Sequence, residues 1–222
     1  ENFDVAIAAY RKVLSLNPRS DVADDAQYAI GHALVKKGEY AKSIPEFDKL
    51  MEQFTSSEWL DDAQFEKGVC YLSQKQYAEA ISAFSQVALK FPQSPTLSDA
   101  LYHIGLSDEG AGEPQKALEA YQKLIQTYPQ SEQKVNAYFR MGDIHHKEKR
   151  YKEAAPAFES VLSYKSELIP EAEFKLADCY FQQNDYARAE RHYQQVVSRG
   201  ANAEWVKEAQ ARLSWIKAHP KP

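Results

Sequence analysis

The sequence lacks several features that would place it in a common functional class. Its 222 residues include only two cysteines, Cys70 and Cys179, which is too few for a disulfide scaffold. No apolar run approaches the roughly 18 residues that a membrane span needs. The net charge of −5 gives no sequence-wide basic field that would attract nucleic acid. We therefore expect no membrane span in this segment and no nucleic-acid partner.

Motifs that carry chemistry are also missing. The sequence has no Gly-rich phosphate loop, no Cys-x-x-Cys pair, no His-Glu-x-x-His and no Gly-x-Ser-x-Gly. The best enzymatic alternative is the segment MGDIHHKE, where Asp143 and His146 lie one helical turn apart and could supply two metal ligands. A stable site needs further ligands, and His145 falls in a row of packing residues. We expect no catalytic, metal or cofactor site, and a metal-binding or catalytic helix around Asp143, His145 and His146 remains an alternative.

The sequence does contain a repeat of about 37 residues. Gly31, Gly68, Gly105 and Gly142 are each 37 residues apart, and Ala177 follows after 35. Two further rows keep this spacing, one of alanines five residues before the Gly position and one of aromatic residues. The rows are Ala26, Ala63, Ala100, Ala137, Ala172 and Ala209, then Tyr10, Phe47, Phe84, Tyr121, Phe158 and Tyr193. Coincidence cannot hold so many rows in one register, so this is a repeat protein.

Each repeat reads as two helices. A serine suits the N-cap of the first helix, because its hydroxyl can accept from an unpaired amide of the first turn. These serines are Ser20, Ser57, Ser94, Ser131 and Ser166. Pro18, Pro92 and Pro129 should stop second helices, since proline cannot continue the hydrogen-bond ladder. Small residues where two helices cross should let the backbones approach, with an aromatic ring filling the space beside them.

The repeats divide the chain into one predicted array over residues 1–222. We expect five hairpins at 20–55, 57–92, 94–129, 131–165 and 166–199, preceded by an orphan second helix at 1–18 and closed by a capping helix at 202–218. The chain begins at Glu1 without Met, and apolar residues in the orphan helix suggest that upstream sequence has been removed. In the third repeat, Asp108 occupies a core row and EGAGEP replaces the usual turn. Asp108 should therefore bond to Tyr71 or His145, or the turn should open and expose it to water.

The combination of rows resembles the tetratricopeptide repeat: a Gly in the first helix, Gly-x-Tyr at the turn, Ala and Phe in the second helix and Pro at the end. The resemblance covers Phe3 to Ile216, with a period three residues longer than the usual 34. It implies an all-α, right-handed superhelical solenoid of antiparallel helix hairpins, each burying its faces against its neighbours. The phrases YPQS and FPQS look like the bacterial envelope subgroup that includes BamD-like outer-membrane assembly lipoproteins and the periplasmic partner of the Tol–Pal system. That subgroup implies a periplasmic or cell-envelope location in a hetero-complex, although related arrays also occur in cytoplasmic adaptors.

A candidate binding surface follows a further aromatic row on the first helices. The row is Tyr28, Phe65, Tyr102, Phe139 and Phe174, and residues four and seven further on share its stripe. The row can pack against neighbouring first helices, line the concave surface of the solenoid, or do both. The early, apolar part of the stripe is the predicted partner site, with three carboxylates at its edge to meet basic residues. It comprises Tyr28, Val35, Phe65, Val69, Leu72, Tyr102 and Leu106, with Asp25, Asp62 and Asp99.

These observations favour a non-enzymatic scaffold that binds a protein or peptide segment in its groove. Besides the metal or catalytic helix, a second alternative is that the segment is a passive spacer arm of a larger protein.

Overall fold

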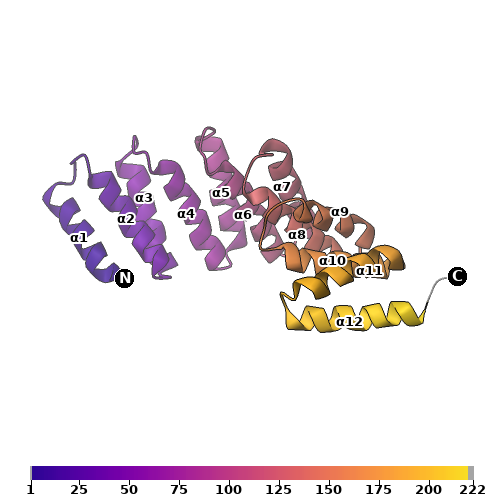
Figure 1. Cartoon of the computed structure of the whole chain (residues 1–222). Coiled ribbons are helices and arrows are strands. Elements are labelled where there is room, and N and C mark those ends of the chain that lie inside the picture. Colours follow the sequence, from indigo (N-terminus) through magenta and orange to yellow (C-terminus); the bar gives the residue numbers. More distant parts are fainter. Residues whose placement is uncertain (1, 220–222) are drawn as a thin grey trace. The chain divides into compact units, whose positions relative to one another are not determined.

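The computed structural model describes residues 2–219 and is entirely helical there (Figure 1). Twelve α-helices and no strand occur within that range, which confirms the predicted all-α helical-repeat fold. Most of these helices are 14 residues long, about four turns, and they are joined by short turns.

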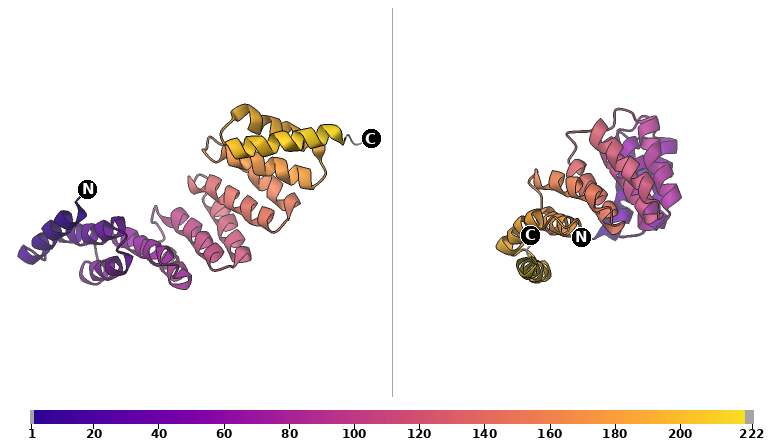
Figure 2. Two further views of the ribbon diagram at one scale, coloured as in Figure 1. Left: turned by 90° about the horizontal axis from the view of Figure 1, so that it is seen from below. Right: turned by 90° about the vertical axis from the view of Figure 1, so that its right-hand side faces the viewer.

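The chain divides into two compact units, residues 1–120 and 121–222, and the division falls inside α7 (Pro114–Thr127). The first unit holds α1 (Phe3–Leu16), α2 (Ala23–Lys36), α3 (Tyr40–Gln53), α4 (Leu60–Ser73), α5 (Tyr77–Lys90) and α6 (Leu97–Gly110). The second holds α8 (Gln133–Lys147), α9 (Tyr151–Leu162), α10 (Ile169–Gln182), α11 (Tyr186–Arg199) and α12 (Ala203–Ala218). In each unit consecutive helices lie side by side and run antiparallel (Figure 2).

The repeated glycines lie where the two helices of a hairpin approach most closely. A Cβ atom added at Gly68 would stand 2.5 Å from the ring of Phe84, and one added at Gly31 would stand 2.6 Å from Phe47. The second unit repeats the contact between Gly142 and Phe158, at 2.7 Å. These rings are fully buried, so the expected pairing of a small residue with a filling aromatic ring is confirmed in three hairpins.

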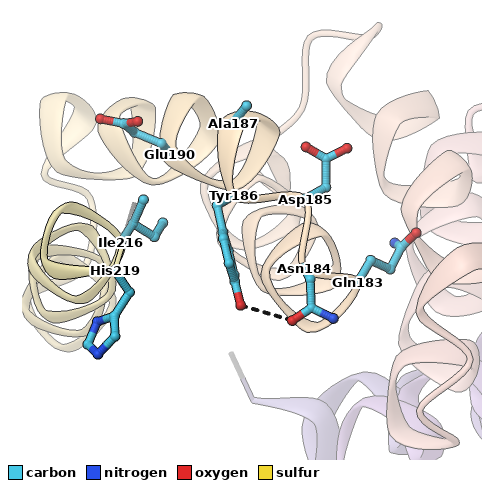
Figure 3. A pocket seen from close by; sticks show the side chains of 8 residues that line it. All are labelled: Gln183, Asn184, Asp185, Tyr186, Ala187, Glu190, Ile216 and His219. Atoms are coloured by element: carbon cyan, nitrogen blue, oxygen red, sulfur yellow. Dashed lines mark hydrogen bonds between the residues drawn. The ribbon is translucent and has the colours of Figure 1, made fainter. Parts of the chain in front are cut away.

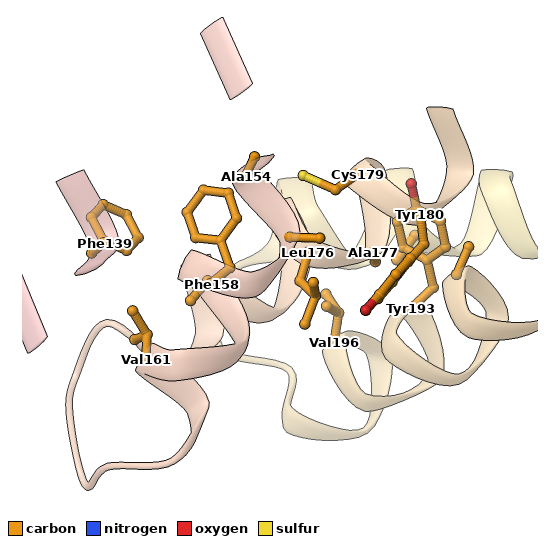
Figure 4. Close-up of a cluster of buried hydrophobic side chains, with 14 of the residues drawn as sticks. Phe139, Ala154, Phe158, Val161, Leu176, Ala177, Cys179, Tyr180, Tyr193 and Val196 are labelled. Atoms are coloured by element: carbon orange, nitrogen blue, oxygen red, sulfur yellow. The ribbon is translucent and has the colours of Figure 1, made fainter. Parts of the chain in front are cut away.

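The core of the second unit runs through all five of its complete helices (Figure 4). Phe139 on α8 lies beside Phe158 on α9, and Leu176 on α10 lies between α9 and the side chains of Tyr193 and Val196 on α11. Because each helix contributes to the same cluster, apolar burial links each hairpin to the next, as expected for a stacked repeat.

The turn inside each hairpin reverses the chain through one residue in the left-handed region. In the first hairpin this residue is Gly38, with φ 76°, and the amide of Glu39 donates to the carbonyl of Leu34 at 2.9 Å, a Schellman-type ending. Lys75, Gly112, Lys149 and Asn184 hold the same place in the later hairpins. The conformation is therefore kept even where the residue is not glycine.

The third hairpin keeps this turn, so the expectation of an opened turn is wrong. Gly112 has φ 77°, and the amide of Glu113 donates to the carbonyl of Asp108 at 2.9 Å. Asp108 is only 6% exposed, and burial raises the pKa of its carboxyl group. Within residues 2–219 it forms no hydrogen bond with Tyr71, and Lys116 is the nearby cation that offsets part of the burial cost.

The first helices begin later than the serine row predicted. Ser57 Oγ accepts from the amide of Trp59 at 3.2 Å, but α4 begins only at Leu60. Ser94, Ser131 and Ser166 accept from the amide two residues on in the same way. These four serines therefore stabilise the turn that leads into the helix, whereas the Ser20 hydroxyl donates to the carbonyl of Asn17 at 3.0 Å. The N-cap positions belong to other residues, so the prediction that the serines are helix N-caps is wrong. The prolines do act as expected: three second helices end two residues before Pro18, Pro92 and Pro129.

Cys70 and Cys179 are free, fully buried thiols. Burial raises the pKa of Cys70 to about 11 and that of Cys179 to about 12. At pH 8 both thiols stay protonated, and only the thiolate is nucleophilic. We expect Ellman's reagent to label neither cysteine in the folded protein at pH 8 and to label both in guanidinium chloride. A disulfide between them, found by mass spectrometry, would contradict the repeat register.

Candidate partner-binding site

The residues predicted to line a groove all lie in the first unit, on the first helices of three hairpins. Each apolar member of the set is partly exposed. Tyr28 and Val35 are on α2, Phe65, Val69 and Leu72 are on α4, and Tyr102 and Leu106 are on α6. Helix α4 contacts both α2 and α6, so these residues belong to neighbouring helices. Asp25, Asp62 and Asp99 lie in the first turns of α2, α4 and α6.

The aromatic row connects one hairpin to the next while leaving part of each ring accessible. The Phe65 ring lies 5.3 Å from Phe84 in its own hairpin and 5.2 Å from His103 on the following first helix. In the second unit, Phe174 packs on Tyr193 at 6.3 Å and stacks on Trp205 at 6.0 Å. Since these rings also keep partial exposure, except for the buried Phe139, the row serves inter-repeat packing and borders the surface.

Trp59 is a site residue that the sequence reasoning missed. It precedes α4 and stacks on Tyr28, with ring centroids 4.6 Å apart and an interplanar angle of 12°. Its indole Nε1 donates to Asp25 Oδ1 at 2.6 Å. A signal was available: Trp59 and Trp205 both stand four residues before the alanine row, and each stacks on a member of the aromatic row.

A pocket of about 720 Å³ opens between α1, α2 and Trp59. Phe3, Ala6 and Tyr10 of α1 line one side, and residues of α2 with Glu58 and Trp59 complete it. The latter group is Asp25, Tyr28, Ala29, His32, Ala33 and Lys36, with Asn2 also at the wall. Two predicted site residues, Asp25 and Tyr28, therefore belong to a hollow whose walls are largely aromatic and aliphatic.

Carboxylates dominate the charge around this pocket. Burial raises the pKa of the Tyr28 hydroxyl, and three nearby carboxylates raise it further. They belong to Glu66, Asp62 and Asp61. His32 Nδ1 lies 3.4 Å from Glu66 Oε1, which links α2 to α4. Burial also raises the pKa of Asp62, with a further contribution from Asp61.

The alternative metal or catalytic helix has a different arrangement. Asp143 forms an ion pair with Lys175 on α10, and His146 Nε2 donates to Asp178 Oδ2 at 2.8 Å. In the part of the chain that the structure describes, no three His, Cys, Asp or Glu side chains are placed so that they could hold a metal ion. Asp143 and His146 therefore both serve to join α8 to α10.

A second pocket, of about 560 Å³, lies in the second unit at the turn between α10 and α11 (Figure 3). Ile216 and His219 at the end of α12 line its far side. Tyr186 donates from its hydroxyl to Asn184 Oδ1 at 2.9 Å. This second pocket contains none of the predicted site residues, so the pocket beside Trp59 is the better candidate for a binding site.

Antiparallel hairpins at a 37-residue spacing, with a glycine–aromatic contact that recurs at their crossings, define a helical-repeat protein of the tetratricopeptide type. Residues 145–213 match a tetratricopeptide-repeat model. Residues 20–147, more than half of the chain, match the model of the outer membrane lipoprotein family YfiO, and the chain belongs to this family. The resemblance to the envelope lipoprotein subgroup is thus confirmed.

Several solved structures share the fold. A structure of MamA is 27% identical, covers 72% of this chain and 87% of its own, and gives a TM-score of 0.61. PilF of Pseudomonas aeruginosa is 18% identical to this chain. The match covers 95% of this chain and 99% of PilF, with a TM-score of 0.67. YrrB, described as a TPR protein with an unusual peptide-binding site, is 19% identical to this chain. The match covers 91% of this chain and 98% of YrrB, with a TM-score of 0.64. No curated protein sequence matches the chain significantly. Between residues 2 and 219 no helix combines the length and apolar character needed to cross a membrane.

Proposed function

We propose that this chain is a non-enzymatic scaffold of a bacterial cell envelope that holds a protein or peptide segment on the first helices of its first unit. The observation that carries the proposal is the partly exposed apolar set on α2, α4 and α6, bordered by carboxylates. Apolar side chains left accessible next to each other commonly mark an interaction surface.

Family membership supports the location and the architecture supports the activity. The chain belongs to an outer membrane lipoprotein family, which favours the periplasm and a role within a hetero-complex. Stacked hairpins offer an extended surface to a partner, and YrrB, which has a similar fold, is described as having a peptide-binding site.

The test begins with capture of a partner from a bacterial envelope fraction by the full-length chain, followed by affinity measurements on that partner. Val69→Asp and Leu72→Glu place charge on the partly exposed face of α4. We expect each to weaken binding about 30-fold, since loss of a buried anchor costs about 2 kcal/mol or more. The matched control is Leu89→Glu, which changes a 74%-exposed leucine on the second helix α5 and should bind as the wild type does.

Circular dichroism separates the possible outcomes. If both α4 variants fold and bind normally, the binding surface lies elsewhere. If either variant loses its helical signal, the residue belongs to the core between repeats and the assignment of this face is wrong.

A further inference from the structure

We infer that the pocket beside Trp59 is an anchor site that takes an apolar side chain of a peptide flanked by lysine or arginine. This inference rests on the proposed function, because it names the partner chemistry of one end of the same surface. It concerns α1, α2 and Trp59, whereas the proposed function is tested on α4.

The pocket has room for a large apolar side chain together with the peptide residues beside it, and its lining suits an apolar group. Its volume of about 720 Å³ lies within the range of about 300–1,000 Å³ typical of ligand pockets. Small side chains at Ala6, Ala29 and Ala33 leave space beside the rings of Tyr10 and Tyr28. Tyr10 lines the pocket and is 37% exposed. An apolar anchor placed here would remove that ring from water.

The pocket is already formed without a partner. Trp59 is fixed by its stack on Tyr28 and by the hydrogen bond from Nε1 to Asp25 Oδ1. Tyr28 also contacts the buried ring of Phe47, with centroids 5.8 Å apart. Rigid walls reduce the conformational entropy lost on binding, which favours affinity.

The carboxylates around the pocket favour basic peptide residues next to the apolar anchor. Asp25 and Glu58 line the pocket, and both are exposed. Asp61, Asp62 and Glu66 raise the negative potential at Tyr28. The lining contains two basic groups, His32 and Lys36. Both lie near Glu66 and offset part of its negative charge. The excess of carboxylates would attract a lysine or arginine next to the anchor and repel an acidic peptide.

The experiment pans a phage-displayed library of random dodecapeptides on the purified full chain and measures labelled synthetic copies of the selected peptides. We expect selected peptides to carry an aromatic or large aliphatic residue within two positions of lysine or arginine. Tyr10→Ala should weaken their binding about tenfold or more. Ala29→Leu, which fills the pocket without removing a contact, should act in the same direction and covers the case in which Tyr10→Ala does not fold.

The contribution of charge is tested with the double variant Asp25→Asn/Glu58→Gln. Asparagine is chosen at position 25 because its amide oxygen can still accept the hydrogen bond from Trp59. We expect the double variant to lose several-fold in peptide affinity at low salt and less at high salt, because salt screens the charges. The matched controls are Glu52→Gln and Leu89→Ala, exposed changes outside the pocket that should leave binding unchanged. Failure to select peptides, selection of acidic peptides, or binding insensitive to Tyr10→Ala and Ala29→Leu would overturn the inference. So would a dimer of the chain that these two variants dissociate, because the occupant would then be a second copy.

The captured partner separates this inference from the proposed function. If Val69→Asp and Leu72→Glu weaken partner binding but Tyr10→Ala and Ala29→Leu do not, the scaffold function stands and the anchor assignment is wrong. If peptides bind the pocket as expected but the α4 variants have no effect on the partner, the α4 surface is wrong and the pocket stands.

Discussion

Replacing Phe84 with alanine should destabilise the first unit by about 3–5 kcal/mol, the usual cost of deleting a buried aromatic ring. Phe84 is fully buried, and its ring fills the space left by Gly68 while contacting Phe65 and His103 at 5.3 Å each. None of these neighbours can easily fill the cavity, because Phe65 and His103 are already held against each other. The measurement is urea denaturation followed by circular dichroism.

Tyr10→Ala is the matched control, because Tyr10 stands in the same sequence row as Phe84 but is 37% exposed. It should cost about 1 kcal/mol or less, as for other accessible positions. Similar losses for the two variants would show that the glycine–aromatic contact is not what stabilises the hairpin.

His192→Leu should destabilise the second unit by about 3 kcal/mol, because it leaves a buried carboxylate without its main partner. Glu173 is 4% exposed on α10, and His192 Nδ1 on α11 donates to its Oε1 at 2.7 Å. Arg199 lies further away, with its guanidinium nitrogen 3.8 Å from Glu173 Oε2. Urea denaturation of the variant measures the loss.

The double variant Glu173→Leu/His192→Leu tests the cause of that loss. Replacing both members of a buried hydrogen-bonded pair by apolar residues is often nearly neutral, so we expect the double variant to recover most of the stability. A double variant as unstable as His192→Leu alone would show that the imidazole acts through packing and not through the carboxylate.

Contacts that repeat at one sequence spacing could be predicted from the sequence. The pairing of Gly31 with Phe47, and of Gly68 with Phe84, followed from two rows in one register. The rows predict these contacts because the two helices of each hairpin cross in the same way, so one residue type recurs at each crossing. The sequence alone therefore predicts the helical-repeat class.

Features that depend on non-repeating residues could not be predicted in this way. Trp59 shapes the candidate pocket, yet only one other tryptophan occupies its row, so the row is not obvious. The serine row was visible, but the sequence could not separate a helix N-cap from a turn residue one or two positions before the cap, since the same hydroxyl suits both. The aromatic row was ambiguous because periodicity places Tyr28 on a stripe without showing that Trp59 covers part of it.

The hydrogen bonds that join successive hairpins connect residues close in the sequence. Trp59 reaches back 34 residues to Asp25, and His146 reaches forward 32 to Asp178. Inside a hairpin, His192 and Glu173 are 19 apart. Closing such short loops costs little chain entropy, and proteins rich in local contacts fold quickly. Two neighbouring hairpins thus contain the partners they need, and the chain can begin to fold during synthesis, as soon as the second of them has emerged from the ribosome.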